Sequence, residues 1–257
     1  MSSLFQPGRL ESTFKSDFWT FTRREVLVKS YNQYCPIARG AEVFATRWTP
    51  VIIRNLLLGC RTYTELRDGA PGISRSLLSE RLDQLERLRI IERQPNPSGR
   101  GWLYALTQAG RDLKPVCEAL GAWGSAWVEL GPQHLDPYAS LWAMARGLRS
   151  VTLPAHRINC RFEFPSMPSN KRHFWLLVQK PEPEICVKHP GCQEDLVVTA
   201  DPEWLARWVL GQISLAQGLK YGSVETSGPD RLVRTLGRLG EQSASALQRW
   251  GEPIAPA

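Results

Sequence analysis

The chain has 257 residues, which at roughly 100–200 residues per domain predicts two domains. Its 42% hydrophobic and 22% charged residues exclude a largely disordered chain. No apolar run approaches the ~18 residues of a transmembrane helix, and the N-terminus lacks the apolar segment of a signal peptide. We therefore expect a cytoplasmic protein without a membrane partner.

Basic charge is concentrated in the N-terminal half. Residues 23–111 carry 15 Lys or Arg against 8 Asp or Glu, which equals the net charge of +7 of the whole chain. Residues 136–257 carry 14 against 12. A basic domain is typical of proteins that bind a polyanion such as DNA, although a solvated basic surface gives the same count.

Helical patterns dominate the first third. Thr62 and Glu65 form a capping box at the start of a short helix, and Ser74 is a favourable N-cap for a longer one. Gly59 and Gly69 end two of the helices. The sequence predicts four helices, at residues 36–46, 48–58, 62–69 and 74–89.

The helix at 74–89 has two different faces. One face is a leucine stripe that would point into a core, and the other carries small polar and arginine side chains. Such side chains approach base edges, and Arg bonds guanine bidentately. With the preceding short helix this predicts a helix-turn-helix whose base-reading residues are Arg75, Ser76, Ser79 and Glu80.

A hairpin follows the predicted recognition helix. Two short β-like runs, 90–94 and 102–106, flank a turn rich in Pro, Gly and Asn. A hairpin in this place is a wing, from which Arg93 and Arg100 would reach phosphates or the minor groove. Further contacts to the DNA backbone are expected from Arg61, Thr62 and Tyr63.

A series of short motifs runs in order through residues 30–130. They are Cys35-Pro36-Ile37-Ala38-Arg39, Arg47-Trp48-Thr49, Leu56-Leu57-Leu58-Gly59, Tyr63-Thr64-Glu65-Leu66-Arg67, Pro71-Gly72-Ile73-Ser74, Leu78-Ser79-Glu80-Arg81-Leu82 and Tyr104-Ala105-Leu106-Thr107 with Gly110. Through these motifs, residues 30–130 resemble the HxlR family of bacterial winged-helix regulators. The resemblance implies a homodimer that binds double-stranded DNA and represses or activates nearby promoters. Members with a cysteine at the position of Cys35 include some that sense oxidants or electrophiles.

Residues 107–130 predict one long helix with an apolar stripe. Trp123 and Trp127 lie on adjacent turns at the domain edge, which favours a subunit interface because Trp is enriched there. A single-domain core would use the same stripe. The aromatic arm at 1–29, with Phe14, Phe18, Trp19 and Phe21, fits either an interface or a core.

After a linker at 131–136, the pattern in 137–257 changes to a mainly antiparallel sheet covered by helices, so the expected fold class is α+β. Alternation at 158–164 indicates a half-buried strand, and 174–178 is apolar on both faces. Further strands are expected at 185–188 and 195–199. The expected helices are 136–148, 201–211, 214–220 and 229–239.

Residues 136–240 resemble the sterol carrier protein type of lipid-binding domain, mainly through Arg161-Phe162-Glu163-Phe164, Phe174-Trp175-Leu176, the run from Asp195 to Asp201, the run from Leu210 to Leu215, and the run from Gly222 to Asp230. The resemblance implies an apolar cavity and, fused to a DNA-binding half, a ligand sensor. The same aromatic residues would also fill a core or a dimer contact. The candidate ligand-binding residues are Phe162, Phe174, Leu176, Trp204 and Trp208.

Chemistry on the cysteines is the remaining question. No pair has C-x-x-C spacing, and Cys186, His189 and Cys192 are one ligand short of a usual structural zinc site, so no metal or other cofactor is expected. Cys35 precedes Pro36 at a helix N-terminus, where the dipole favours a thiolate, although a small buried side chain is equally compatible.

Enzyme motifs such as G-x-S-x-G, the P-loop and the dinucleotide fingerprint are missing, so we expect no enzyme. The sequence predicts a homodimeric transcriptional regulator that acts on inverted-repeat operators, with a C-terminal domain that binds an apolar small molecule or serves as an interaction surface. The alternatives are a thiol or electrophile sensor acting through Cys35 with a C-terminal domain that binds no ligand, and a lipid-binding carrier protein.

Overall fold

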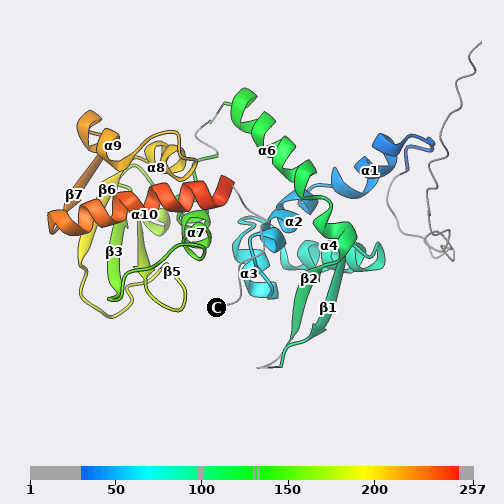
Figure 1. Ribbon diagram of the computed structural model, residues 1–257, viewed down its shortest axis with the longest axis horizontal. Coiled ribbons are helices and arrows are strands. Elements are labelled where there is room, and N and C mark those ends of the chain that lie inside the picture. The colour runs from blue at the N-terminus through cyan, green and yellow to red at the C-terminus, as the bar shows by residue number, and fades with distance from the viewer. Residues whose placement is uncertain (1–29, 98–100, 130, 132–133, 249–257) are drawn as a thin grey trace, which may run out of the picture.

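The computed structural model describes residues 30–97, 101–129, 131 and 134–248. The predicted arm at 1–29 and the wing residue Arg100 lie outside the described residues. Two bodies stand side by side, an N-terminal winged-helix unit and a C-terminal sheet covered by helices (Figure 1). The expected α+β class and the winged helix-turn-helix are confirmed.

The N-terminal body follows the predicted order of elements. Its two strands pair as an antiparallel hairpin, and a bridge between Thr62 and Leu103 attaches the start of α3 to β2. The elements are α1 (Pro36–Phe44), α2 (Thr49–Leu57), α3 (Tyr63–Asp68), α4 (Arg75–Arg87), β1 (Ile91–Pro95), β2 (Trp102–Leu106), α5 (Gln108–Arg111) and α6 (Lys114–Trp127).

The core of this body lies beneath α2, α3 and α4. Leu78, Leu82 and Leu85 of the predicted leucine stripe are buried, as the 3/4 spacing requires. They pack with Ile52, Ile53, Leu66, Ile91, Tyr104 and Leu106, and with Trp142 from a helix of the other body.

The single helix predicted at 107–130 is wrong, because the chain forms two helices there. Thr107 caps α5 by accepting a hydrogen bond from the Gly110 amide at 3.2 Å. The second helix, α6, restarts at Lys114 with Pro115 in its first turn. Proline lacks an N–H and its ring blocks the carbonyl four residues earlier, so a continuous helix cannot pass through this position.

The C-terminal body is a five-stranded sheet with helices. Its strand order is β5-β4-β3-β6-β7, in which β3 and β6 are parallel and the other neighbours antiparallel. The elements are α7 (Pro137–Leu148), β3 (Ile158–Glu163), the short η3 (Ser169–Lys171), β4 (His173–Val178), β5 (Glu184–Cys186), β6 (Leu196–Ala200), α8 (Pro202–Val209), α9 (Leu215–Tyr221), β7 (Val224–Ser227) and α10 (Asp230–Gln248).

The helices cover one face of this sheet. The apolar residues of β3, β4 and β6 form one buried cluster with α7, α8, α9 and α10. The opposite face carries a polar network in which Arg161 pairs with Glu163 at 3.0 Å and with Glu194 at 3.1 Å. Alternation of side chains along each strand produces this separation.

Two C-terminal elements differ from the expectation. The strand β7 was not predicted, and α10 extends to Gln248, beyond the expected end at 239. Residues 240 and 243–246 are Gly, Ser or Ala. Ser243 and Ala244 are buried, and the Ser243 hydroxyl donates to the Met144 carbonyl of α7 at 2.8 Å. Small residues contribute little to the apolar pattern of a sequence, and this helix face is buried because the neighbouring helix packs close to it. No helix in the described part of the chain is long and apolar enough to cross a membrane.

Candidate nucleic-acid interface

The α3–turn–α4 unit is fixed by two capped helices. The Thr62 hydroxyl accepts from the Glu65 amide at 3.2 Å, and the Glu65 carboxylate accepts from the Thr62 amide at 2.9 Å. Ser74 caps α4 by accepting from the Leu77 amide at 3.3 Å. The Tyr63 hydroxyl donates to the Arg75 carbonyl at 2.9 Å and ties the two helices together. Both predicted caps are confirmed.

The predicted base-reading residues share one exposed face of α4. Arg75, Ser76, Ser79 and Glu80 all lie in its first two turns and are exposed. Within the described part of the chain, the Arg75 guanidinium has no hydrogen-bond or ion-pair partner, whereas Glu80 pairs with Arg81 at 3.0 Å. The first two turns of α4 thus present an unpaired guanidinium and two small hydroxyls, which suits major-groove contacts.

The start of α3 lies beside the wing. Arg61 is exposed, and its carbonyl accepts from the Tyr104 amide of β2 at 2.7 Å. Thr62 and Tyr63 are half-buried, and their hydroxyl groups already bond within the unit. Of these three residues predicted to contact the DNA backbone, Arg61 is therefore the one whose side chain is most available.

The Glu65 carboxylate at this helix start is strongly perturbed. Burial raises its pKa, but the amides of Arg61 and Thr62 and the nearby Arg146 lower it more, so the pKa falls to about 2. Arg146 and Arg149 donate to Glu65 Oε1 at 3.1 and 3.2 Å. The group is therefore ionised throughout the neutral range and serves as a fixed structural anion.

In the wing, Arg93 is engaged with the recognition helix. It pairs with Asp83 at 3.3 Å and with Glu86 at 3.1 Å, and its guanidinium lies 4.9 Å from the centroid of the Trp102 ring. These contacts hold the hairpin against α4. A phosphate contact by Arg93 would require the pairs with Asp83 and Glu86 to open, so its predicted role is secondary to positioning the wing.

The last helix of the N-terminal body, α6, exposes an apolar face. Trp123 and Trp127 are 58% and 76% exposed, and Val116 and Leu120 are also exposed. On the same helix, Cys117 is buried against the core. An exposed apolar stripe of this length on one helix is typical of a protein–protein contact.

Three of the six cysteines are buried and three are partly exposed. Burial raises the pKa of Cys60 and of Cys117 to about 11, and that of Cys160 to about 12, which keeps these thiols protonated. Cys35 is the N-cap of α1 and is partly exposed. Arg39 lies one turn on, but it pairs with Glu42 at 2.5 Å.

The Cys186–His189–Cys192 segment is occupied by protein contacts. His189 packs edge-on against Trp175 at 5.5 Å, and Cys192 accepts from the Asn159 amide group through its carbonyl at 3.1 Å. In the described ranges, no three His, Cys, Asp or Glu side chains lie close enough to hold a metal ion.

The predicted ligand-binding residues lie in the interior of the C-terminal body. Phe162, Phe174, Leu176, Trp204 and Trp208 are all nearly fully buried in its core cluster. Trp204 and Trp208 stack at 5.0 Å, and each indole N–H lacks a partner among the described residues. A separate surface hollow of about 550 Å³ is polar, and is lined by Ala155, Arg157, Gln179, Lys180, Gln193 and Asp195.

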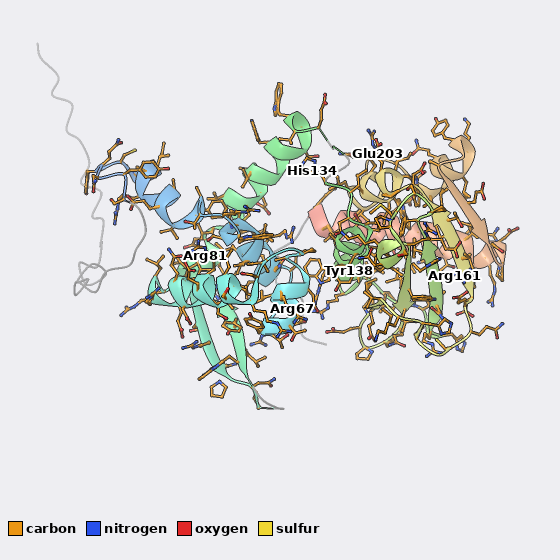
Figure 2. All side chains as sticks on the ribbon, turned by 180° about the vertical axis from the view of Figure 1, so that it is seen from behind. Arg67, Arg81, His134, Tyr138, Arg161 and Glu203 are labelled. Atoms are coloured by element: carbon orange, nitrogen blue, oxygen red, sulfur yellow. The ribbon has the colours of Figure 1, made fainter. Side chains whose placement is uncertain are left out.

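Sequence reasoning missed three residues that contact this unit. Trp142 and Arg146 belong to α7, and Arg149 is the residue at its C-terminal cap, yet they contact α2 and α3 of the winged-helix unit. Tyr138 of the same helix lies at the junction of the two bodies (Figure 2). The only available signal was the spacing of the two arginines, three apart on one helical face.

Comparison with known proteins agrees with this geometry. Residues 43–132 match the family model "HxlR-like helix-turn-helix". The HTH-type transcriptional regulator YodB of Bacillus subtilis is 34% identical over 102 residues, which cover 39% of this chain and 91% of YodB. YvaP of the same organism, an uncharacterized HTH-type transcriptional regulator, is 29% identical over 107 residues, 41% of this chain and 97% of YvaP.

Among solved structures, the reduced form of YodB aligns with a TM-score of 0.34 and 34% identity, over 38% of this chain and 99% of that one. The sequence match to YodB spans nearly the whole of that regulator and exceeds 30% identity. The chain therefore belongs to the HxlR-like helix-turn-helix family of transcriptional regulators.

Proposed function

We propose that the protein binds operator DNA as a homodimer, with the first turns of α4 in the major groove. The observation that carries this proposal is the exposed α4 face, on which the Arg75 guanidinium has no hydrogen-bond or ion-pair partner among the described residues. An inverted-repeat operator with half-sites about one helical turn apart, or a multiple of it, would match a two-fold dimer. The protein acts as a regulator and not as an enzyme.

The homodimer is supported by the exposed face of α6. Four apolar side chains on one helix, two of them Trp, are costly to leave in water. Pairing this face with the same face of a second copy would bury them and would space two α4 helices on the operator. The basic charge of residues 23–111 supplies the attraction to phosphate.

Operator binding is tested through Arg75. The Arg75→Ala change should leave the fold intact because the side chain is exposed, and should cost roughly 1–3 kcal/mol of specific binding if it contacts a base. Arg87→Ala removes the same charge from the exposed end of the same helix and is the matched control. Operators selected from random DNA are measured by fluorescence anisotropy at fixed salt. An unchanged operator preference in Arg75→Ala would reject the assignment of α4.

For the C-terminal body, we propose a role as the regulatory half of the protein. Its resemblance to sterol carrier domains favours an apolar ligand, and the aromatic residues Phe162, Phe174, Trp204 and Trp208 would meet it. These side chains fill the core in the structure, so ligand entry would require them to separate. Apolar-ligand sensing stays a prediction, and carriage of lipid without DNA binding is its competitor.

A thiol switch at Cys35 is the second candidate function. Cys35 is partly exposed at the N-cap of α1, whereas Cys60, Cys117 and Cys160 are buried and protonated. Brief treatment of the native protein with iodoacetamide, followed by mass spectrometry, should modify Cys35 before the other five. Modification of Cys35 no faster than of Cys192, which is also partly exposed, would remove the thiol-sensor hypothesis.

A further inference from the structure

Helix α7 is shared between the two bodies. Leu141, Met144 and Leu148 point into the core of the C-terminal body, while Trp142 is 6% exposed in the core of the winged-helix unit. In Figure 1, α7 lies on the side of the sheet that faces α3. The family match ends at residue 132, so the whole of α7 lies outside it.

At the C-terminal end of α3, Trp142 fits against a glycine. A Cβ placed on Gly69 would come within 2.4 Å of the Trp142 ring, so the ring occupies space that only glycine leaves open. Two guanidinium groups flank the ring, Arg54 at 5.7 Å and Arg146 at 5.2 Å from its centroid. Arg54 in turn donates to the Gly69 carbonyl at 2.7 Å. The end of α3 is therefore packed and hydrogen-bonded around a side chain of α7.

At the N-terminal end of α3, Arg146 of α7 and Arg149, the residue at the C-terminal cap of α7, bind the carboxylate of the capping box. Glu65 uses Oε2 to accept from the Arg61 and Thr62 amides, and Oε1 to accept from Arg146 and Arg149. Arg149 is 17% exposed and also pairs with Glu182, in the loop between β4 and β5. Arg149 thus connects Glu182 of the C-terminal body to Glu65 in the capping box of α3 through two ion pairs.

This arrangement assigns a role to α7 that rests on the proposed DNA-binding function. We propose that Trp142, Arg146 and Arg149 are positioning residues for operator binding: they hold α3 at both ends, and Arg149 transmits the position of the C-terminal body to it through Glu182. The start of α3 also bridges to β2 of the wing, and Tyr63 bonds to the first residue of α4. A displacement of α7 therefore changes the placement of α3, α4 and the wing together.

The test uses three substitutions in the full chain. Glu182→Gln cuts the tie between the C-terminal body and Arg149 and leaves the Arg149–Glu65 pair in place. Arg149→Gln removes both contacts, and Arg149→Lys keeps the charge. Glu203→Gln is the matched control, since Glu203 pairs with Arg207 at 2.8 Å on the exposed face of α8, far from α3 (Figure 2).

Hydrogen exchange of the α3 amides and operator affinity are measured on each variant. We expect Arg149→Gln to speed α3 exchange roughly 5- to 30-fold, the effect of losing a modest stabilising contact, and Glu182→Gln to speed it less. Both should weaken operator binding with little change in melting temperature, and Arg149→Lys should restore much of it. Glu203→Gln should match the wild type in both measurements.

Three results would overturn the proposal. One is α3 exchange in Arg149→Gln and Glu182→Gln that equals that of the control. Another is faster exchange over the whole chain, which would indicate general destabilisation. Faster α3 exchange with unchanged operator affinity would also reject the positioning role. If the wild type binds no operator, the DNA-binding proposal fails, and the exchange data still report whether α7 holds α3.

Discussion

Glu65 shows how one side chain can serve two structural roles. It completes the capping box that the sequence predicts, and it also accepts hydrogen bonds from two arginines that lie more than 80 residues away in the chain. The capping role is local and can be read from the spacing of Thr62 and Glu65. The arginine contacts depend on the packing of α7. The amides of Arg61 and Thr62, with a further contribution from Arg146, lower the pKa of this carboxylate to about 2.

The pH dependence of stability follows from that pKa. Because the folded state lowers it from 4.5 to about 2, the ionised carboxylate adds stability above about pH 4.5, and this contribution is lost as the pH falls toward 2. Glu65→Gln mimics the protonated form, so at pH 7 we expect it to be less stable by about 1–3 kcal/mol.

Urea unfolding of both proteins between pH 7 and pH 2 measures this difference. The two stabilities should converge at the acidic end, where the wild-type carboxyl is protonated. Glu163→Gln, a carboxylate of the C-terminal sheet, serves as the charge-matched comparison. A stability difference that does not depend on pH would show that Glu65 acts through its shape and not its charge.

At the scale of elements, we expect the exposed apolar face of α6 to decide the oligomeric state. Trp123 and Leu120 lie one turn apart on its exposed face and would meet a second copy near the centre of a helix–helix contact. Trp123→Glu should therefore convert a dimer into a monomer without unfolding it. Operator binding should fall sharply, because a single half-site provides about half of the contacts.

Sedimentation equilibrium across a range of concentrations checks this expectation. Val187→Glu, an equally exposed apolar position in the C-terminal body, is the control and should leave the mass unchanged. A wild-type monomer at all concentrations, or a Trp123→Glu dimer as tight as the wild type, would move the interface away from α6.

At the scale of the whole molecule, the question is whether the C-terminal body is a ligand container or a packed module. Trp208 is 1% exposed, stacks on Trp204 and meets α10 at Gly240, where a Cβ would come within 2.1 Å of its ring. Trp208→Ala should cost about 3–5 kcal/mol of stability if the ring is a core residue. Trp208→Phe should cost much less, because the indole N–H has no partner among the described residues.

Thermal melting and binding of fluorescent fatty acids to the same variants separate the two roles. A core role gives a large loss of melting temperature in Trp208→Ala and no lipid binding by the wild type. A container would bind the fatty acid in the wild type, tolerate the cavity left by Trp208→Ala and change its affinity for the probe.

The sequence by itself determined the winged-helix unit and the placement of most of the candidate interface residues. Four of its features are local patterns: the capping box at Thr62, the cap at Ser74, the leucine stripe and the exposed Arg75 face. Local patterns can be predicted because residues close together on one helix are neighbours regardless of how the rest of the chain folds. The break between α5 and α6 also has a local signal, Pro115, but the continuous apolar stripe on either side of it favoured a single helix.

Only the tertiary structure decided what α7 does. Its sequence reads as one amphipathic helix, but its residues divide between two cores, and Trp142, Arg146 and Arg149 find partners far away in the chain. Periodicity states which face of a helix is apolar but not which surface will cover it. Contacts such as Arg149 with Glu65 depend on how two bodies dock, and no short stretch of sequence contains that information.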